Sequence, residues 1–317
     1  MPVSRRRDAD WPLISSRCPT PGSGNSHIPR VPVTLYWYGF AQRRTGRDRA
    51  MSVRPHVEVI LATSADGRIA DAMRSPTRLG SNHDLLHLYR RLQEADAVLY
   101  GAATLRTIGY GMLIRDHDIV AGRVRTQRPQ QPIQIVVSHL CKFPTSLPFF
   151  AERGAPHWLL TSNSGHPAAD GFDRVICHVG RDGKIDWHEA LRTLAESGIR
   201  SLVVAGGGEV VSALLNCGLV DDLRLTICPL VIGGVGAPTP VDGLPKPIGE
   251  AVALELVSAE QIGHEMYLWY RVQRHDLTGN REFENHPLGT IMINCLASAL
   301  LWTGRLHGGN QAVVLAF

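Results

Sequence analysis

The chain has 317 residues, of which 44% are hydrophobic and 20% charged, a composition typical of a globular protein that buries a full core. Its net charge of +4 originates in the first 50 residues, where nine Arg and three Asp give +6, whereas residues 51–274 carry 22 Lys and Arg against 23 Asp and Glu. This balance gives no sign of the basic face that nucleic-acid binding requires, and no run reaches the roughly 18 apolar residues of a membrane helix.

Residues 1–50 mix Arg, Pro, Ser and Gly without a sustained hydrophobic period. A segment of this composition does not bury enough apolar surface to offset the entropy that it loses on ordering. We therefore expect a disordered arm or an overextended gene start. Because the arm is rich in Arg and poor in acids, an organelle-targeting peptide is the alternative.

Alternating strands and helices are predicted from Met51 onward. Short apolar runs are typical of strands buried on both faces, and helical periodicity follows the candidate N-cap residues Ser81 and Asn82. The predicted helices cover 82–92, a short segment after Gly101, 187–197 and 209–215. The predicted strands cover 57–62, 97–100, 133–137, 158–161, 174–178, 201–204, 223–232 (broken by Pro229), 253–257 and 266–272.

This alternation predicts one α/β domain over residues 51–274, with a mostly parallel sheet, helices on both faces and an antiparallel final pair of strands. Residues 275–317 contain several Gly and Pro around one isolated apolar stretch. We expect them to form a disordered or loosely attached tail.

The cysteines are widely scattered, and no two have the CxxC spacing of a zinc site or a redox couple. We therefore expect no metal site, and reduced thiols in a cytoplasmic setting. The six are Cys18, Cys141, Cys177, Cys217, Cys228 and Cys295.

Three turns rich in small residues each follow a predicted strand: Ala62–Ala70, Gly101–Arg106 and Ala205–Glu209. The third contains three consecutive glycines before a helix, so backbone N–H groups and a helix N-terminus converge where a phosphate can bind. Each turn alone is equally compatible with a tight packing turn. Because parallel strands end at one edge of a sheet, where ligands bind in α/β folds, the three together predict a ligand site.

Other catalytic signatures are weak. The glycine turn matches neither GxGxxG nor the P-loop, and the chain has no GxSxG elbow and no HxE with a following PCxxC for zinc deamination. His83 and His87 are four residues apart without a partnering glutamate. They are expected on a solvated helix face rather than at a metal.

Four segments together resemble the reductase domain of the bifunctional riboflavin-biosynthesis deaminase–reductase. They are ATSADGRIA (62–70), DAVLYGAATLR (96–106), VVAGGGEVVSALL (203–215) and GLVDDLRLTICPLVIGG (218–234). The resemblance spans residues 54–274 in the family's order and spacing. It implies a dihydrofolate-reductase-like fold, in agreement with the alternation of elements.

The resemblance also implies an activity. The family transfers a hydride from NADPH to ribose C1′ of 5-amino-6-(5-phosphoribosylamino)uracil, and the product carries a ribityl chain. Because the nicotinamide supplies the hydride, the protein has to align it with C1′ and exclude water. A homodimer is implied, as is a separate deaminase, since this chain lacks that half.

Site residues are assigned by position in the family's motifs. Asp66 and Arg68 are predicted catalytic residues, with Arg68 where a lysine is frequent after Asp-Gly. Ser75 and Arg115 are predicted to touch the substrate, the arginine its phosphate. The predicted cofactor contacts are Ala62, Thr104, Ser138, His139, Gly206, Gly207, Gly208 and Glu209.

The chain departs from the family pattern at two places. Ala205 replaces a glutamate that commonly precedes the glycines, and residues 107–110 replace an Asp-Asp-Pro. These changes leave two alternatives open. One is a reductase of the same fold that acts on a pterin or another carbonyl compound, and the other is a catalytically silent dinucleotide-binding module.

Overall fold

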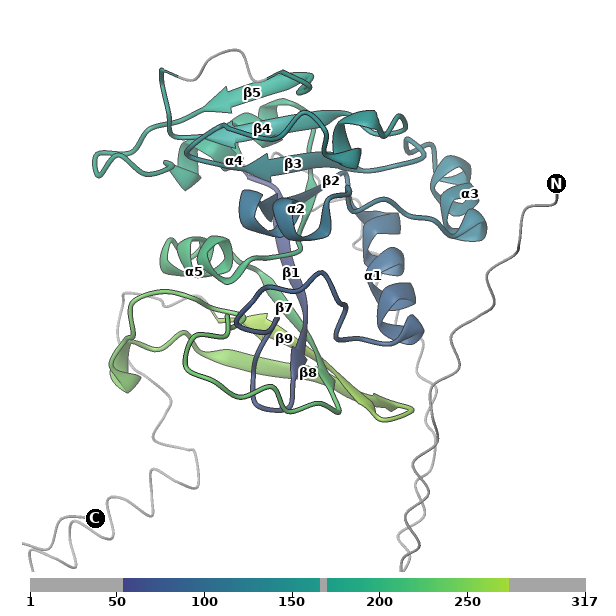
Figure 1. Cartoon of the computed structure of the whole chain (residues 1–317), viewed down its shortest axis with the longest axis vertical. Helices are drawn as coiled ribbons and strands as arrows, with labels where there is room; N and C mark the ends of the chain where they lie inside the picture. The colour runs from purple at the N-terminus through teal and green to yellow at the C-terminus, as the bar shows by residue number, and fades with distance from the viewer. Residues whose placement is uncertain (1–53, 166–169, 274–317) are drawn as a thin grey trace, which may run out of the picture. The chain divides into compact units, whose positions relative to one another are not determined.

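A computed structural model describes residues 54–165 and 170–273. The predictions for residues 1–50 and 275–317 lie outside these ranges. The described residues form one nine-stranded sheet in the order β5-β4-β3-β2-β6-β1-β7-β9-β8, which Figure 1 shows from top to bottom. The strands are β1 (His56–Ser64), β2 (Ala97–Gly101), β3 (Ile133–Val137), β4 (His157–Thr161), β5 (Arg174–Cys177), β6 (Ser201–Val204), β7 (Asp222–Cys228), β8 (Leu254–Ile262) and β9 (Glu265–Val272).

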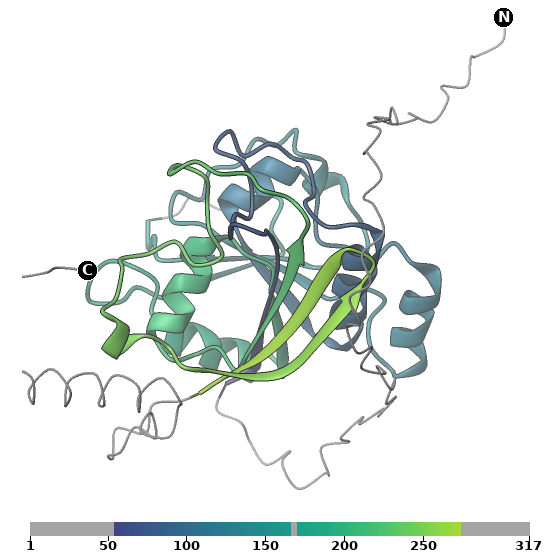
Figure 2. The same cartoon turned by 90° about the horizontal axis from the view of Figure 1, so that it is seen from below.

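The sheet is parallel from β5 to β7, and only the β8–β9 hairpin introduces antiparallel pairing. Figure 2 shows this hairpin from below. The predicted mostly parallel sheet with an antiparallel final pair is therefore confirmed.

Helices cover both faces of the sheet, also as predicted. The helices are α1 (Asn82–Glu94), α2 (Ala102–Ile108), α3 (His117–Arg125), α4 (Trp187–Glu196) and α5 (Gly208–Asn216), with short 3-10 helices at Pro148–Ala151 and Ile248–Glu250. One buried cluster packs α4 and α5 on the sheet, and the other packs α1, α2 and α3 on the opposite face.

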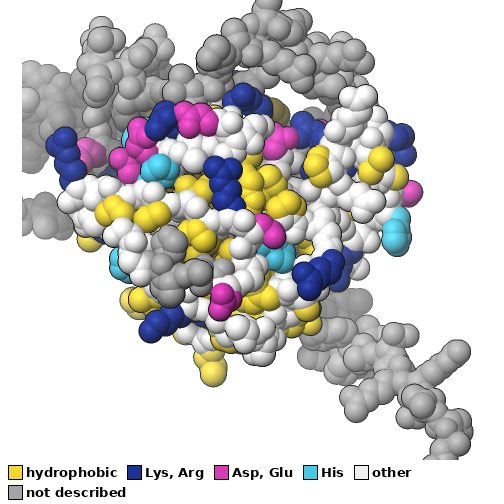
Figure 3. Space-filling model, turned by 90° about the horizontal axis from the view of Figure 1, so that it is seen from above, with side chains coloured by type: hydrophobic (Ala, Val, Ile, Leu, Met, Phe, Trp, Pro, Cys, Tyr) yellow, Lys and Arg dark blue, Asp and Glu magenta, His cyan; other side chains and the backbone are white. Residues whose placement is uncertain are grey.

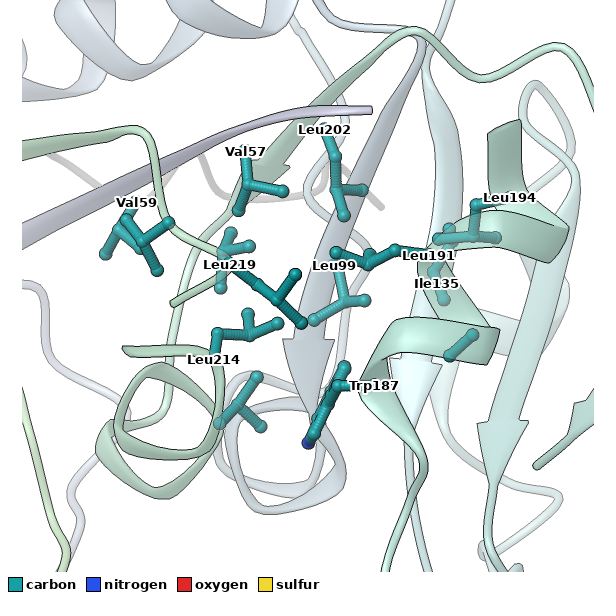
Figure 4. Packing of buried hydrophobic residues seen from close by; sticks show 14 of the residues in the cluster. Val57, Val59, Leu99, Ile135, Trp187, Leu191, Leu194, Leu202, Leu214 and Leu219 are labelled. Carbon is teal, nitrogen blue, oxygen red and sulfur yellow. The ribbon is translucent and has the colours of Figure 1, made fainter. Parts of the chain in front are cut away.

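Strand β1 lies between these clusters, which explains its continuous apolar sequence. Val57 and Val59 belong to the cluster under α4 and α5, whereas Ile60 belongs to the cluster under α1 to α3. Figure 4 shows Trp187 and Leu191 of α4 among the side chains of the first cluster.

Three elements differ from the prediction. Strand β7 ends at Cys228, before the predicted end at 232, because Pro229 has no N–H to donate. Strand β8 continues to Ile262 through residues that are mostly exposed at the sheet edge and so lack an apolar signal. Helix α3 was not predicted, because its buried face offers only Ile119, Gly122 and Arg123.

Three further observations concern the surface charge, the cysteines and membrane-spanning helices. Positive and negative side chains are interspersed on the face in Figure 3, rather than gathered by sign. The four cysteines within the described ranges are free thiols, as expected. No helix in the described part of the chain combines the length and apolar character needed to cross a membrane.

Candidate active site

A cavity of about 1050 Å³ opens at the carboxyl edge of the parallel strands. The turns after β1, β2, β3, β4 and β6 all contribute to its wall, together with α1, α2 and α5. All eight predicted cofactor residues and both predicted substrate residues line it. The sheet topology thus brings together residues that are up to 147 positions apart, between Ala62 and Glu209.

The glycine turn is held tightly between β2 and α5. Gly206 has a φ of +93° and accepts a hydrogen bond from the N–H of Gly101 at 2.9 Å, and the Gly206–Gly207 peptide bond is cis. Gly207 is the N-cap of α5 and offers no side chain to cap it. Within the described ranges no group accepts a hydrogen bond from the N–H of Gly207, Gly208 or Glu209. These donors are available to an anion.

A side chain at Gly208 would collide with the surrounding wall, and one at Gly206 would be strained by the positive φ and tightly packed. A Cβ on Gly206 would lie 3.0 Å from Leu61, and a Cβ on Gly208 would lie 2.3 Å from the carbonyl oxygen of Thr239. The Gly207 position faces Thr104 Oγ1 at 3.6 Å. Only glycine lets the backbone lie this close to the wall, which fits the role of a phosphate cradle.

The residues that follow β3 and β4 form another part of the cavity wall. His139 Nδ1 lies 2.9 Å from Ser162 Oγ, and both residues line the cavity with Ser138. Lys184, in the turn between β5 and α4, lines the same cavity and is exposed. Sequence reasoning missed Lys184 and Ser162, because neither lies in a recognisable motif.

The loop between β1 and α1 and the loop after α2 carry the predicted substrate residues. Ser75 is held by Asp71, whose carboxylate accepts its N–H at 2.9 Å. Arg115 lies 3.3 Å from Glu152, which also accepts the N–H of Gly111 at 2.7 Å. Burial raises the pKa of Glu152. The Arg115 side chain is 62% exposed, so its remaining N–H groups can reach a ligand.

Asp66 and Arg68, the two predicted catalytic residues, do not line the cavity. Asp66 accepts hydrogen bonds from Ser64 Oγ at 2.6 Å and from the N–H groups of Ile232 and Gly233 at 3.0 and 2.7 Å. Arg68 donates to the carbonyl oxygen of Ala237 at 2.9 Å. Both side chains therefore connect the loop after β1 to the loop after β7, which suits a positioning role better than contact with substrate.

Asp66→Asn is expected to destabilise this connection in a pH-dependent way. Hydrogen bonds from the Ser64 hydroxyl and from the Ile232 and Gly233 N–H groups lower the pKa of Asp66 from 3.8 to about 2. The stabilisation is therefore fully present above pH 3.8 and is lost as the pH falls towards 2. Urea unfolding should show a lower midpoint for the variant at pH 7, and the difference should shrink between about pH 4 and pH 2. An equal difference at both ends of this range would contradict the assignment.

Arg78 and Asp84 also line the cavity but were not predicted. Arg78 Nη2 donates to Asp84 Oδ2 at 2.8 Å, and the Asp84 side chain is only 12% exposed. An acid in the first turn of a helix normally indicates favourable interaction with the helix dipole. No sequence motif marks Asp84, so its position at the cavity wall is evident only from the structure.

One cluster of metal-ligand type exists in the described ranges, formed by His56, Glu58 and Asp222. Arg91 donates to both Glu58 oxygens at 2.7 and 3.0 Å, and Arg224 Nε lies 3.2 Å from Glu58. These arginines already supply the positive charge that a cation would bring. None of the three cluster residues lines the cavity.

The family model described as the RibD C-terminal domain matches residues 55–268. The chain belongs to the RibD C-terminal domain family. The match covers more than half of the chain and contains every predicted site residue.

Two archaeal relatives of this RibD-family chain bear the name 2,5-diamino-6-ribosylamino-4(3H)-pyrimidinone 5′-phosphate reductase. The one from Methanothermobacter thermautotrophicus is 29% identical and aligns over 70% of this chain and 100% of its own length. The one from Archaeoglobus fulgidus is 27% identical, over 60% of this chain and 88% of its own length. A solved pyrimidine reductase-like protein from Corynebacterium diphtheriae has the same fold, with a TM-score of 0.57, 22% identity and coverage of 70% and 93% of the two chains.

Proposed function

We propose that this chain is an NADPH-dependent reductase of riboflavin biosynthesis that acts on a ribosylamino-pyrimidine 5′-phosphate. The observation that carries the proposal is one cavity lined by the glycine turn and by Thr104, Ser138, Ser75 and Arg115. The names of the archaeal relatives, which align over nearly their whole length, support the same substrate class.

The residues present fit a dinucleotide. The free N–H groups of the glycine turn and the N-terminus of α5 suit the pyrophosphate. Thr104 lies beside that turn, and Ala62 lies at the end of β1, where the nicotinamide ring would approach the substrate. Ser138 and His139 would hold the adenosine half.

Lys184 is proposed to select NADPH over NADH, since an ammonium group at the adenosine end suits the 2′-phosphate. Lys184→Glu should raise KM for NADPH about tenfold or more and leave KM for NADH within about twofold, as expected for one lost charge contact. Initial rates with each cofactor measure this. Lys246→Glu, an exposed lysine outside the cavity, is the matched control and should change neither value. Equal effects on both cofactors would refute the proposal.

The substrate phosphate would be bound by Ser75 and Arg115. Bound NADPH would supply a hydride for C1′ of the ring-opened sugar imine, and the imine nitrogen would take up a proton. The chain's contribution is alignment and exclusion of water. Asp66 and Arg68 lie outside the cavity wall. We therefore propose that they hold the loop after β1 against the loop after β7, next to the cavity.

Measured oxidation of NADPH tests the proposal. The purified chain should oxidise NADPH with a ribosylamino-pyrimidine 5′-phosphate and not with a dihydropterin. Turnover of the pterin alone would instead support the same-fold alternative that Ala205 motivates. Cofactor binding without any turnover would indicate a silent dinucleotide-binding module.

We expect a homodimer that works in the cytoplasm, and a separate protein that carries out the deamination. Light scattering measures the first, and a mass of one chain would contradict it.

A further inference from the structure

We infer that Glu265, on the β8–β9 hairpin, is a positioning residue for the substrate, because it holds the end of the loop that presents Ser75 to the cavity. This inference rests on the proposed function, which assigns a substrate contact to Ser75. It adds a residue that does not itself line the cavity. The loop comprises residues 69–80, between β1 and α1, and is called the substrate loop below.

The substrate loop forms much of the cavity wall without regular structure. Ile69, Ala70 and residues 74–80 all line the cavity. In the described structure, residues 65–81 form neither a helix nor a strand. The path of the substrate loop therefore depends on a few individual hydrogen bonds rather than on a backbone ladder.

The first of these hydrogen bonds hold the start of the substrate loop. The N–H of Ile69 donates to the carbonyl oxygen of Pro238 at 3.0 Å, in the loop after β7. Asp71 accepts the N–H of Ser75 at 2.9 Å. These contacts act on the first half of the substrate loop, so the arrangement of the second half depends on how its end is held.

Glu265 holds that end at Ser81, the residue that directly follows the substrate loop. Glu265 Oε1 accepts the N–H of Ser81 at 2.6 Å, and Oε2 accepts the Ser81 hydroxyl at 2.7 Å. Ser81 is the N-cap of α1, and its Oγ also accepts the N–H of His83 at 3.1 Å. Both the backbone and the side chain of Ser81 are thus tied to one carboxylate, 184 positions away in the sequence.

The Glu265 carboxylate is itself firmly placed. Glu265 is 5% exposed, and its Oε2 also accepts the hydroxyl of Tyr267 at 2.6 Å. Burial opposes ionisation of Glu265, but hydrogen bonds from Tyr267 and Ser81 outweigh burial and hold the pKa of Glu265 below its usual value. A buried carboxylate that accepts from three donors has little freedom to shift, so the hairpin is a rigid support for Ser81.

A change in the position of Ser81 reaches the cavity wall directly. A Cβ on Gly80 would lie 2.2 Å from Asp84 Oδ2, so the chain before Ser81 is in close contact with the first turn of α1. Arg78 Nη2 donates to the same Asp84 oxygen at 2.8 Å. Because residues 78–80 are packed against α1, displacement of Ser81 moves the part of the substrate loop that lines the cavity.

The residues proposed for the cofactor lie on other elements. Thr104 belongs to α2, Ser138 follows β3, and the glycine turn leads into α5. Among the described residues, the Glu265 carboxylate forms hydrogen bonds only with Ser81 and Tyr267. Loss of this carboxylate should therefore weaken substrate binding and spare cofactor binding, a split that a general loss of stability does not produce.

Calorimetry on the full chain tests this split with two ligands. These are NADP⁺, and the ribitylamino-pyrimidine 5′-phosphate product titrated with NADP⁺ present. Glu265→Ala removes all three accepted hydrogen bonds and should raise Kd for the product about tenfold or more, with Kd for NADP⁺ within about twofold. Glu265→Gln keeps one acceptor oxygen and should raise Kd for the product by about fivefold. Glu260→Ala, an exposed glutamate on β8, is the matched control and should change neither Kd.

An unchanged Kd for the product in the Glu265 variants, or equal weakening of both ligands, would overturn the inference and leave the proposed function intact. If Glu265→Ala does not fold, Glu265→Gln decides, because it preserves the size of the side chain. Failure of the unsubstituted chain to bind the product would instead contradict the proposed function.

Hydrogen exchange gives a readout that needs no ligand. The amides of residues 75–85 should exchange faster in Glu265→Gln than in the unsubstituted chain, whereas those of the glycine turn should exchange at the same rate. Equal exchange of residues 75–85 in the two proteins would overturn the inference, whatever the chain binds.

Discussion

Gly208→Ala is expected to weaken NADPH binding by about 100-fold, equivalent to about 2.7 kcal/mol. The new Cβ would lie 2.3 Å from the carbonyl oxygen of Thr239 and 2.7 Å from Asp242 Oδ2. A backbone oxygen cannot rotate away, so either α5 or the loop after β7 has to move. Both carry parts of the cavity wall, and displacement of α5 would misdirect the N–H groups proposed for the pyrophosphate. Quenching of protein fluorescence by NADPH measures the affinity.

The matched control is Gly236→Ala in the same loop, where a Cβ meets nothing within 4 Å and no positive φ is required. It should bind NADPH as the unsubstituted chain does. If Gly208→Ala retained full affinity, the glycine turn would not be the pyrophosphate site. Overpacking also costs about 1–3 kcal/mol of stability, so the thermal midpoint should be recorded for both variants.

Arg123→Ala is expected to reduce the free energy of unfolding by about 4 kcal/mol, the range found when one partner of a buried charged contact is removed. Arg123 is completely buried. Its guanidinium donates to the carbonyl oxygens of Leu92, Gln93, Ala95 and Pro129 and so caps the carboxyl end of α1. The substitution removes these donors and leaves buried carbonyls without partners.

Chemical denaturation measures the loss of stability. The control is Arg125→Ala, which lies on the exposed side of α3, the helix that also carries Arg123. The control removes an equal charge and should change stability by less than about 0.5 kcal/mol. A similar small effect of Arg123→Ala would show that the α1 carbonyls find other partners. The expected thermal shift is about 10 °C for a domain of this size.

The fold could be predicted where local sequence and burial agree. Strands β1, β2 and β3 are buried on both faces, so their apolar runs fix their positions closely. Helix α3 was not predicted, because its buried face includes Arg123 and arginine is usually exposed. Only the first part of strand β8 was predicted, because an edge strand with mostly exposed residues shows no alternation of hydrophobic and polar residues.

The candidate site was predictable where motifs follow strands. Ala62, Thr104 and the glycine turn lie at strand ends, and the parallel sheet brings such ends together. Lys184 and Asp84 were missed because only the three-dimensional path of the chain shows that they reach the cavity. The catalytic roles given to Asp66 and Arg68 depended on sequence position, whereas the direction of both side chains is set by contacts with residues 232–237.

The central claim is hydride transfer from NADPH to C1′ of a ribosylamino-pyrimidine 5′-phosphate. The most direct measurement uses NADPH deuterated at C4 and follows the label by mass spectrometry and NMR. The account predicts a ribitylamino product with one deuterium at C1′ and a matching amount of NADP⁺. A product without deuterium, or consumption of cofactor without a ribitylamino product, would contradict it.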